Sequence, residues 1–200
     1  MTDRKYDAVL CDLLTGLLDS WTLWDAAAGG VEPGRRWRMA YLQVTFAQPG
    51  AYVSYEDLVA EAARMEDIPD AAVQALFDGY GNLKPWPGVP ETLWAVQAMG
   101  LPVGIVTNCS VVLGEKAAAA VGVDVDAVTI AEISGWYKPN PNAYAAGLAA
   151  LGTTPERTLY VAGSPFDIAG AHGAGMDVFW HNQAGMAPGD GGAPVVMDAR

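Results

Sequence analysis

The chain has few cysteines, histidines and basic residues for its 200 positions, and each shortage excludes a class of protein. Cys11 and Cys109 are too few for a disulfide-stapled secreted scaffold, so reduced thiols are expected. His172 and His181 have no partner at ligand spacing, which argues against a histidine metal cluster. Lys and Arg number 11 against 23 acidic residues, a net charge of -12. Nucleic acids and anionic membranes are therefore not expected as partners.

Long hydrophobic runs are also missing. No apolar run approaches membrane-spanning length, and the first residues lack the pattern of a signal peptide, so we expect a cytoplasmic protein. A hydrophobic content of 52% nevertheless suits a compact α/β domain with an inserted lobe. An anionic small molecule is compatible with the net charge, because a pocket responds to nearby cations; Arg38 and Lys138 are the candidates.

Short apolar runs rich in β-forming residues alternate with helical patterns. This alternation predicts a parallel sheet with helices on both faces. The sequence predicts strands at residues 6–11, 101–107, 127–130, 158–162 and 178–180, with a last one at 195–197. In such sheets ligands bind beyond the carboxyl ends of the strands.

The strand signal disappears between residues 20 and 85, where apolar residues recur at helical spacing. We expect an all-helical cap over residues 20–85, inserted into an α/β core made of residues 1–19 and 86–200. A Pro- and Gly-rich turn marks the return to the core, and residues 89–99 read as its first helix.

Polar residues follow the predicted strands at four places. Asp12 ends the first apolar run and is followed closely by Thr15 and Gly16, while Thr107 and Asn108 end the second. Lys138 precedes a Pro-initiated helix, and Asp167 lies in the loop after the apolar run at 158–162. A carboxylate at the end of a buried strand is costly without a partner or a role, so Asp12 is a candidate nucleophile.

These four places, in this order, resemble the motifs of the haloacid dehalogenase (HAD) superfamily across nearly the whole chain. The resemblance implies a HAD-like Rossmannoid parallel sheet with an inserted α-helical cap. It makes Asp12 the nucleophile and Lys138 the cation that keeps Asp12 ionised. Thr107 and Asn108 would bind the nucleophile or substrate, and Asp167 would guide a water molecule.

Leu14, two residues after Asp12, separates the chemistries of the superfamily. Phosphatases carry an aspartate there, which protonates a poorly leaving alkoxide, whereas a leucine holds no proton. A halide leaves as a stable anion and needs no such donor. Asp12 and Asp167 alone are also a thin donor set for Mg²⁺, so no metal or other cofactor is expected. Both departures are similar to the 2-haloacid dehalogenase branch.

Further positions extend the resemblance toward a substrate site. The helix around Arg38, WRMAYLQ, resembles the dehalogenase helix whose arginine holds the substrate carboxylate, a task that suits a planar guanidinium. Tyr144 matches a tyrosine of the dehalogenase site. Ser164 stands where dehalogenases have an asparagine, Ala162 replaces a serine, and Thr15-Gly16 reverses the usual Gly-Thr order. Because of these differences, the resemblance does not identify the exact substrate.

The sequence therefore predicts a hydrolase that acts at C2 of a small carboxylic acid through an aspartyl-ester intermediate, as in (S)-2-haloacid dehalogenases. Ring opening of azetidine-2-carboxylate is an alternative, in which Trp21, Trp24 and Trp136 could contact a cationic amine. A HAD phosphatase and a non-catalytic HAD-fold binding protein are two others. The expected partner is a small carboxylate, and a homodimer is compatible with this reading.

Overall fold

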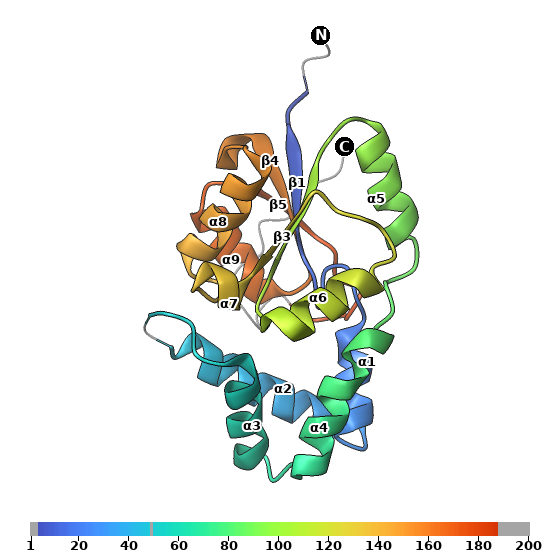
Figure 1. Ribbon diagram of the computed structural model, residues 1–200, viewed down its shortest axis with the longest axis vertical. Helices are drawn as coiled ribbons and strands as arrows, with labels where there is room; N and C mark the ends of the chain where they lie inside the picture. The colour runs from blue at the N-terminus through green and yellow to red at the C-terminus, as the bar shows by residue number, and fades with distance from the viewer. Residues whose placement is uncertain (1–3, 49, 188–200) are drawn as a thin grey trace.

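A computed structural model describes residues 4–48 and 50–187 of the chain. Within them, five parallel strands form one sheet in the order β3-β2-β1-β4-β5 (Figure 1). The strands are β1 Ala8–Asp12, β2 Val103–Thr107, β3 Ala127–Ile130, β4 Thr158–Ala162 and β5 Asp177–Trp180. This arrangement confirms the predicted parallel α/β fold, whereas the strand predicted at 195–197 lies outside the described residues.

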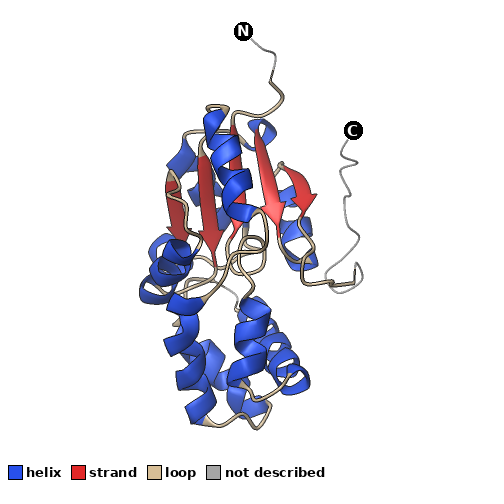
Figure 2. Cartoon of the chain, turned by 90° about the vertical axis from the view of Figure 1, so that its right-hand side faces the viewer, coloured by secondary structure: helices blue, strands red, loops and turns tan. Residues whose placement is uncertain are grey.

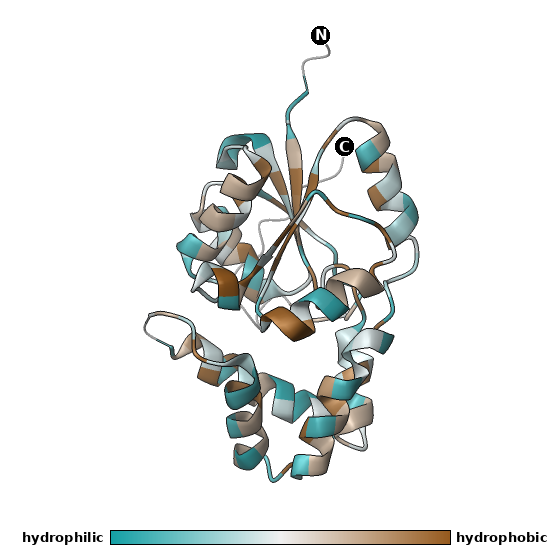
Figure 3. Ribbon diagram, in the orientation of Figure 1, coloured by the Kyte–Doolittle hydropathy of each residue, from teal (hydrophilic) through white to brown (hydrophobic). Residues whose placement is uncertain are grey.

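Side chains alternate across the sheet and build two apolar clusters. Leu10, Val106 and Tyr160 point to one face, where they pack with α8 Pro141–Leu151 and α9 Pro165–Gly173. Val9 and Ile105 point to the other face, toward α5 Val89–Ala98 and α6 Val111–Ala120. In Figure 3 brown residues run along the central strands, while the helices carry both colours. The sheet is therefore the centre of the core, buried on both faces by helices.

The strands point their carboxyl ends toward a group of helices that contains no strand (Figure 2). Its helices are α1 Ser20–Ala27, α2 Val31–Phe46, α3 Tyr55–Met65 and α4 Asp70–Asp78, followed by the 3₁₀ turn η1 Gly79–Asn82. Side chains cap two of them: Asp19 accepts from the Thr22 N–H before α1, and Ser54 accepts from the Asp57 N–H before α3.

The chain enters and leaves this helical group at neighbouring points. Leu18 and Pro85 form an antiparallel bridge, and the Asp19 N–H donates to the Lys84 carbonyl at 2.8 Å. The domain boundaries predicted at 19/20 and 85/86 fall beside this bridge and stay a prediction. Two shorter elements complete the described chain, α7 Ala131–Ser134 and η2 Pro155–Arg157.

Candidate active site

Asp12 is the last residue of β1, the central strand, and the following loop folds back over its side chain. Its Oδ2 accepts hydrogen bonds from the backbone N–H groups of Thr15, at 3.0 Å, and Gly16, at 2.7 Å. A glycine is required there, because a Cβ on Gly16 would lie 2.5 Å from the Asp12 carbonyl oxygen. Two backbone dipoles therefore stabilise the charged form of Asp12.

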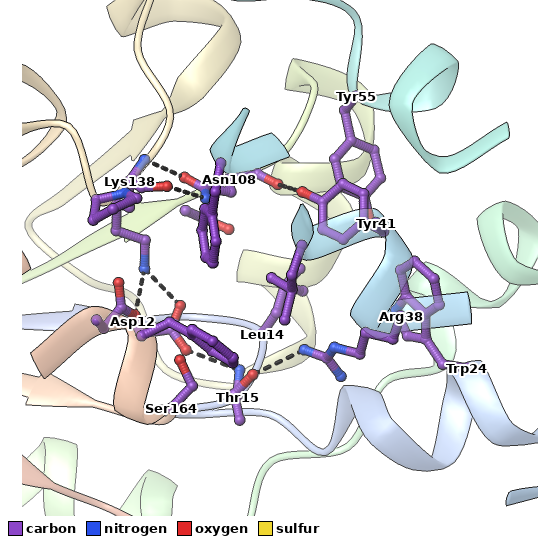
Figure 4. A pocket seen from close by; sticks show the side chains of 16 residues that line it. Asp12, Leu14, Thr15, Trp24, Arg38, Tyr41, Tyr55, Asn108, Lys138 and Ser164 are labelled. Atoms are coloured by element: carbon purple, nitrogen blue, oxygen red, sulfur yellow. Dashed lines mark hydrogen bonds and ion pairs between the residues drawn. The ribbon is translucent and has the colours of Figure 1, made fainter. Parts of the chain in front are cut away.

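Lys138 joins the two predicted carboxylates. Its Nζ lies 2.7 Å from Asp12 Oδ1 and 2.9 Å from Asp167 Oδ2, and it donates to the Tyr160 hydroxyl at 3.1 Å. In Figure 4 the Lys138 side chain extends toward Asp12. The three charged side chains are buried, with exposures of 4% for Lys138, 7% for Asp12 and 6% for Asp167. Asp12 is 126 residues and Asp167 is 29 residues away from Lys138 in the sequence, yet both bind its ammonium group.

Asn108 fixes the loop that carries Lys138. Its Nδ2 donates to the Lys138 carbonyl at 2.9 Å, and its Oδ1 accepts from the Lys138 N–H at 2.7 Å. Thr107 ends β2 and lines the site, and its hydroxyl donates to Cys109 Sγ at 3.5 Å. The Asn108 side chain therefore holds the Lys138 backbone and also lines the cavity, and its predicted contact with the nucleophile or the substrate stays a prediction.

Burial and charge give the two carboxyl groups different acidities. Burial by itself raises the pKa of Asp12, but Lys138 and the loop N–H groups outweigh it and hold this pKa below its usual value. Burial also raises the pKa of Asp167, and here the attraction of Lys138 does not reverse it. Burial lowers the pKa of Lys138, yet the two carboxylates more than compensate and raise it. Asp12 is thus the ionised group and Asp167 the more basic one.

Each oxygen of the two carboxylates already accepts at least one hydrogen bond from the protein, and the Lys138 ammonium lies between them. Asp12 Oδ1 and Asp167 Oδ2 bind Lys138, Asp12 Oδ2 binds the loop N–H groups, and Asp167 Oδ1 accepts from the Tyr144 hydroxyl at 3.1 Å. Mg²⁺ requires near-octahedral oxygen ligands at about 2.0–2.1 Å, so this donor set does not fit it. In the described parts of the chain, no group of three or more His, Cys, Asp or Glu side chains could hold a metal ion.

A cavity of about 60 Å³ lies beside Asp12, between the strand ends and the helical group. A space of this size suits a molecule of a few heavy atoms. Most of its surface is apolar. Its lining residues are Asp12, Leu14, Thr15, Trp24, Arg38, Tyr41, Leu42, Phe46, Tyr55, Thr107, Asn108, Lys138, Pro139, Ser164, Phe166 and Asp167.

Arg38 reaches the cavity from α2 and brings a second cation (Figure 4). Its Nη2 donates to Thr15 Oγ1 at 2.8 Å, and its guanidinium carbon lies 4.0 Å from the Trp21 ring centre. Its Nη1 has no hydrogen-bond partner among the residues that the structure describes. Burial lowers the pKa of Arg38, but an arginine side chain stays charged in proteins. A buried cationic N–H without a partner suits an anionic ligand.

The predicted residues gather around this cavity with three differences. Tyr144 lies behind Asp167 and bonds its Oδ1. Trp21 stacks on the guanidinium of Arg38, and Trp136 packs against the apolar cluster of α8 and α9, so of the three predicted tryptophans it is Trp24 that lines the cavity.

Sequence reasoning missed several residues of the site. Tyr160 binds Lys138 from the middle of β4, and the Phe46 and Phe166 rings pack 5.4 Å apart at the cavity. Signals for two of them were present: Tyr160 carries a hydroxyl within the apolar run LYVA, and Phe166 directly precedes Asp167. The approach of Phe46 depends on how α2 lies over the sheet.

Comparisons with known proteins agree with this geometry. The model of the haloacid dehalogenase-like hydrolase family matches residues 10–175. Haloacetate dehalogenase H-2 from Moraxella sp. (strain B) is 27% identical over 199 residues, covering 92% of this chain and 89% of that protein. (S)-2-haloacid dehalogenase from Pseudomonas fluorescens is 28% identical over 159 residues, covering 74% and 70%.

A solved structure shows the same likeness in three dimensions. The L-2-haloacid dehalogenase RSc1362 superposes with a TM-score of 0.84 at 27% identity, covering 96% of this chain and 94% of that one. The likeness extends over sheet and helical group together, and the family match spans all four predicted motifs. The chain belongs to the haloacid dehalogenase-like hydrolases.

Proposed function

We propose that this protein is a metal-independent dehalogenase of small (S)-2-haloacids, with Asp12 as the nucleophile. One observation carries the proposal: an ionised, lysine-bound Asp12 lies beside a small cavity in which Leu14 occupies the place of a proton donor. A halide leaves without a proton, so this site suits displacement at carbon. The names of the relatives, a haloacetate dehalogenase and an (S)-2-haloacid dehalogenase, support the same substrate class.

In the first step, Arg38 binds the substrate carboxylate through its unpartnered Nη1. Asp12 Oδ1 accepts one hydrogen bond, from Lys138, whereas Oδ2 accepts two. Oδ1 therefore has a lone pair for attack at C2. The new C–O bond forms as the carbon–halogen bond breaks, and the halide leaves with the bonding electron pair. The product of this step is an ester of Asp12 with inverted configuration at C2.

In the second step, water hydrolyses this ester. Asp167 accepts a proton from the water, which its raised pKa favours, and the water oxygen bonds to Cγ of Asp12. Negative charge develops on Oδ2, where the N–H groups of Thr15 and Gly16 already donate. The bond between Cγ and the ester oxygen then breaks, the 2-hydroxy acid leaves with the proton that Asp167 took from water, and the new carboxyl group of Asp12 releases its own proton to solvent. One oxygen of the regenerated Asp12 comes from water.

The alternatives fit the site less well. A cationic amine, as in azetidine-2-carboxylate, would need a free aromatic face, but the guanidinium of Arg38 covers Trp21 and lies 5.8 Å from the Trp24 ring centre. A phosphatase would need an acid in place of Leu14 and a site that fits Mg²⁺. A cytoplasmic location and a homodimer remain predictions from the sequence.

The decisive experiment follows the oxygen of water. The purified protein is incubated, with EDTA present, with less than one equivalent of (S)-2-chloropropionate in heavy-oxygen water. The masses of its proteolytic peptides are then measured by mass spectrometry. We expect the label on the peptide that contains Asp12 and none in the first-turnover lactate. Label that enters the lactate directly would refute the aspartyl ester.

Two variants and three further substrates complete the test. Asp12→Asn should lower halide release at least about 1,000-fold, whereas Asp124→Asn, an exposed aspartate, should leave it unchanged. Chloroacetate, (R)-2-chloropropionate and azetidine-2-carboxylate are tested in parallel by proton NMR. If only azetidine-2-carboxylate is converted, the leaving group is the ring nitrogen, and the proposed haloacid substrate is wrong. Mg²⁺-dependent cleavage of phosphate esters alone would sink the proposal.

A further inference from the structure

The peptide group between Thr15 and Gly16 is held at both of its ends. Its N–H donates to Asp12 Oδ2 at 2.7 Å, and its carbonyl oxygen accepts from the indole Nε1–H of Trp86 at 2.8 Å. The C=O and N–H of a trans peptide point in opposite directions within one plane, so fixing the oxygen aims the N–H. Hydrogen bonds in series through one peptide also polarise each other.

Two further contacts fix the same loop. A Cβ on Gly163 would lie 2.0 Å from Gly16 N and 2.1 Å from the Thr15 carbonyl carbon, so one face of this peptide lies directly against Gly163. The carbonyl of Gly16 is 2.7 Å from His181 Nδ1. A carbonyl oxygen only accepts, so Nδ1 carries the proton, and Gln183 Nε2 lies 3.2 Å from the other ring nitrogen.

Trp86 belongs to the segment by which the chain returns from the helical group. Its own N–H donates to the Leu17 carbonyl at 2.9 Å, next to the bridge between Leu18 and Pro85. Trp86 therefore touches the Asp12 loop twice, through its backbone and through its indole. Trp86 is not among the described residues that line the cavity, so it acts on the site through the Asp12 loop.

We infer that Trp86 is a positioning residue, which aims the Gly16 N–H at Asp12 Oδ2. This N–H is then a donor of the oxyanion hole when the aspartyl ester is hydrolysed. His181 supports the adjoining peptide. The inference rests on the proposed function, because Oδ2 becomes an oxyanion only when water adds to that ester. The geometry favours this role over simple packing: the indole donates a directed bond to the peptide that serves Asp12.

The expected effect falls on the second chemical step. Removal of one oxyanion donor costs about 100- to 1,000-fold in kcat, and an N–H that is misaimed rather than removed should cost about 10- to 100-fold. Formation of the ester needs no charge on Oδ2 and should slow less. The ester therefore accumulates during turnover, and KM for the haloacid falls together with kcat.

Two changes at position 86 test this. Trp86→Phe removes the N–H and one ring, and replacement of the Trp86 indole by benzothiophene keeps the two-ring shape and removes the N–H alone. Trp94→Phe is the matched control, because Trp94 lies on α5 and is 54% exposed. Rapid quenching and mass spectrometry measure the fraction of Asp12 held as ester, and NMR measures the amide proton of Gly16.

The outcomes separate this inference from the proposed function. We expect both Trp86 variants to raise the ester fraction several-fold and to shift the Gly16 amide proton upfield, with Trp94→Phe unchanged. A Gly16 resonance that stays in place, or an ester fraction equal to the control, overturns the inference. If the wild-type protein forms no ester with any haloacid, the proposed function fails, and the Gly16 resonance still reports whether the indole aims this N–H.

Discussion

Replacement of Lys138 by methionine tests the charge arrangement on which the proposed chemistry depends. The ammonium lies between Asp12 and Asp167, and all three groups are buried. Methionine has a similar length and keeps the packing, but it leaves two buried carboxyl groups without their cation. We expect the folded variant to avoid this by binding a proton on one carboxyl group near neutral pH.

The contacts set the size of this effect. Distances of 2.7 Å and 2.9 Å to one nitrogen place the two carboxylate oxygens at most about 5.6 Å apart. At an effective dielectric constant of about 20, two negative charges at that distance repel by about 3 kcal/mol, which raises the pKa of one carboxyl group. Burial adds to this rise. Loss of one partner from a buried ion pair costs about 3–5 kcal/mol of stability at neutral pH.

The stability of Lys138→Met relative to wild type should depend on pH. In Lys138→Met a carboxyl pKa in the folded state exceeds its unfolded value near 4, so the folded state binds the extra proton between these two pKa values. Acid then favours folding of the variant. Its deficit relative to wild type should shrink as the pH falls from 7 to 5, by at most about 1.4 kcal/mol for each pH unit.

Urea unfolding at pH 5, 6, 7 and 8 measures this deficit, and halide release measures activity. Lys116→Met is the control, because it removes one positive charge from an exposed position on α6. We expect Lys138→Met to lose at least about 1,000-fold in kcat/KM, with a deficit that falls toward acid. A deficit that is constant from pH 5 to pH 8 would refute the coupling of the two carboxyl groups through Lys138.

Three other predictions address the site. Gly163→Ala should lower kcat at least about 10-fold and reduce the melting temperature, since its Cβ would collide with the Gly16 peptide; Gly173→Ala, which meets nothing within 4 Å, should do neither. Leu14→Asp should lower halide release at pH 7 more than Leu14→Asn, because only the aspartate adds a second negative charge beside the nucleophile. The kcat of the wild type should fall toward acid with an apparent pKa above the 3.8 of an ordinary aspartate, because Asp167 must be ionised to accept a proton. A profile that is unchanged in Asp167→Asn would exclude this base.

The sheet could be predicted because its signals are local. Residues 127–130 and 158–162 were predicted as strands and form β3 and β4 with the same bounds. The first strand was predicted at residues 6–11, whereas β1 runs from Ala8 to Asp12 and so includes the proposed nucleophile. Asp12, Lys138 and Asp167 could be found because carboxyl ends of parallel strands share one edge of a sheet, so distant positions must meet there.

The supporting residues could not be predicted because their roles depend on tertiary contacts. Trp86 reads as part of a Pro-rich turn, and only the fold shows that its indole donates to Thr15. His181 reads as a structural histidine, and its bond to Gly16 requires β5 to lie beside β4. Tyr160 is marked in the sequence by a hydroxyl within an apolar run, but its bond to Lys138 depends on the fold that brings the two residues together. No fixed sequence spacing links any of these three residues to the group that it binds.

The charges of the site explain why a carboxylate substrate suits this acidic protein. Asp12 and Asp167 oppose Lys138 and Arg38, so the four buried ions sum to zero before substrate binds. In the proposed mechanism a bound haloacid adds one negative charge, which departs with the halide when Asp12 becomes an ester. The ester state, with its carboxylate still on Arg38, is then neutral again. A buried site favours the state without uncompensated charge. In the proposed mechanism the site therefore stabilises the ester relative to bound substrate, whereas a phosphate ester would bring excess negative charge that no further cation among the described lining residues balances.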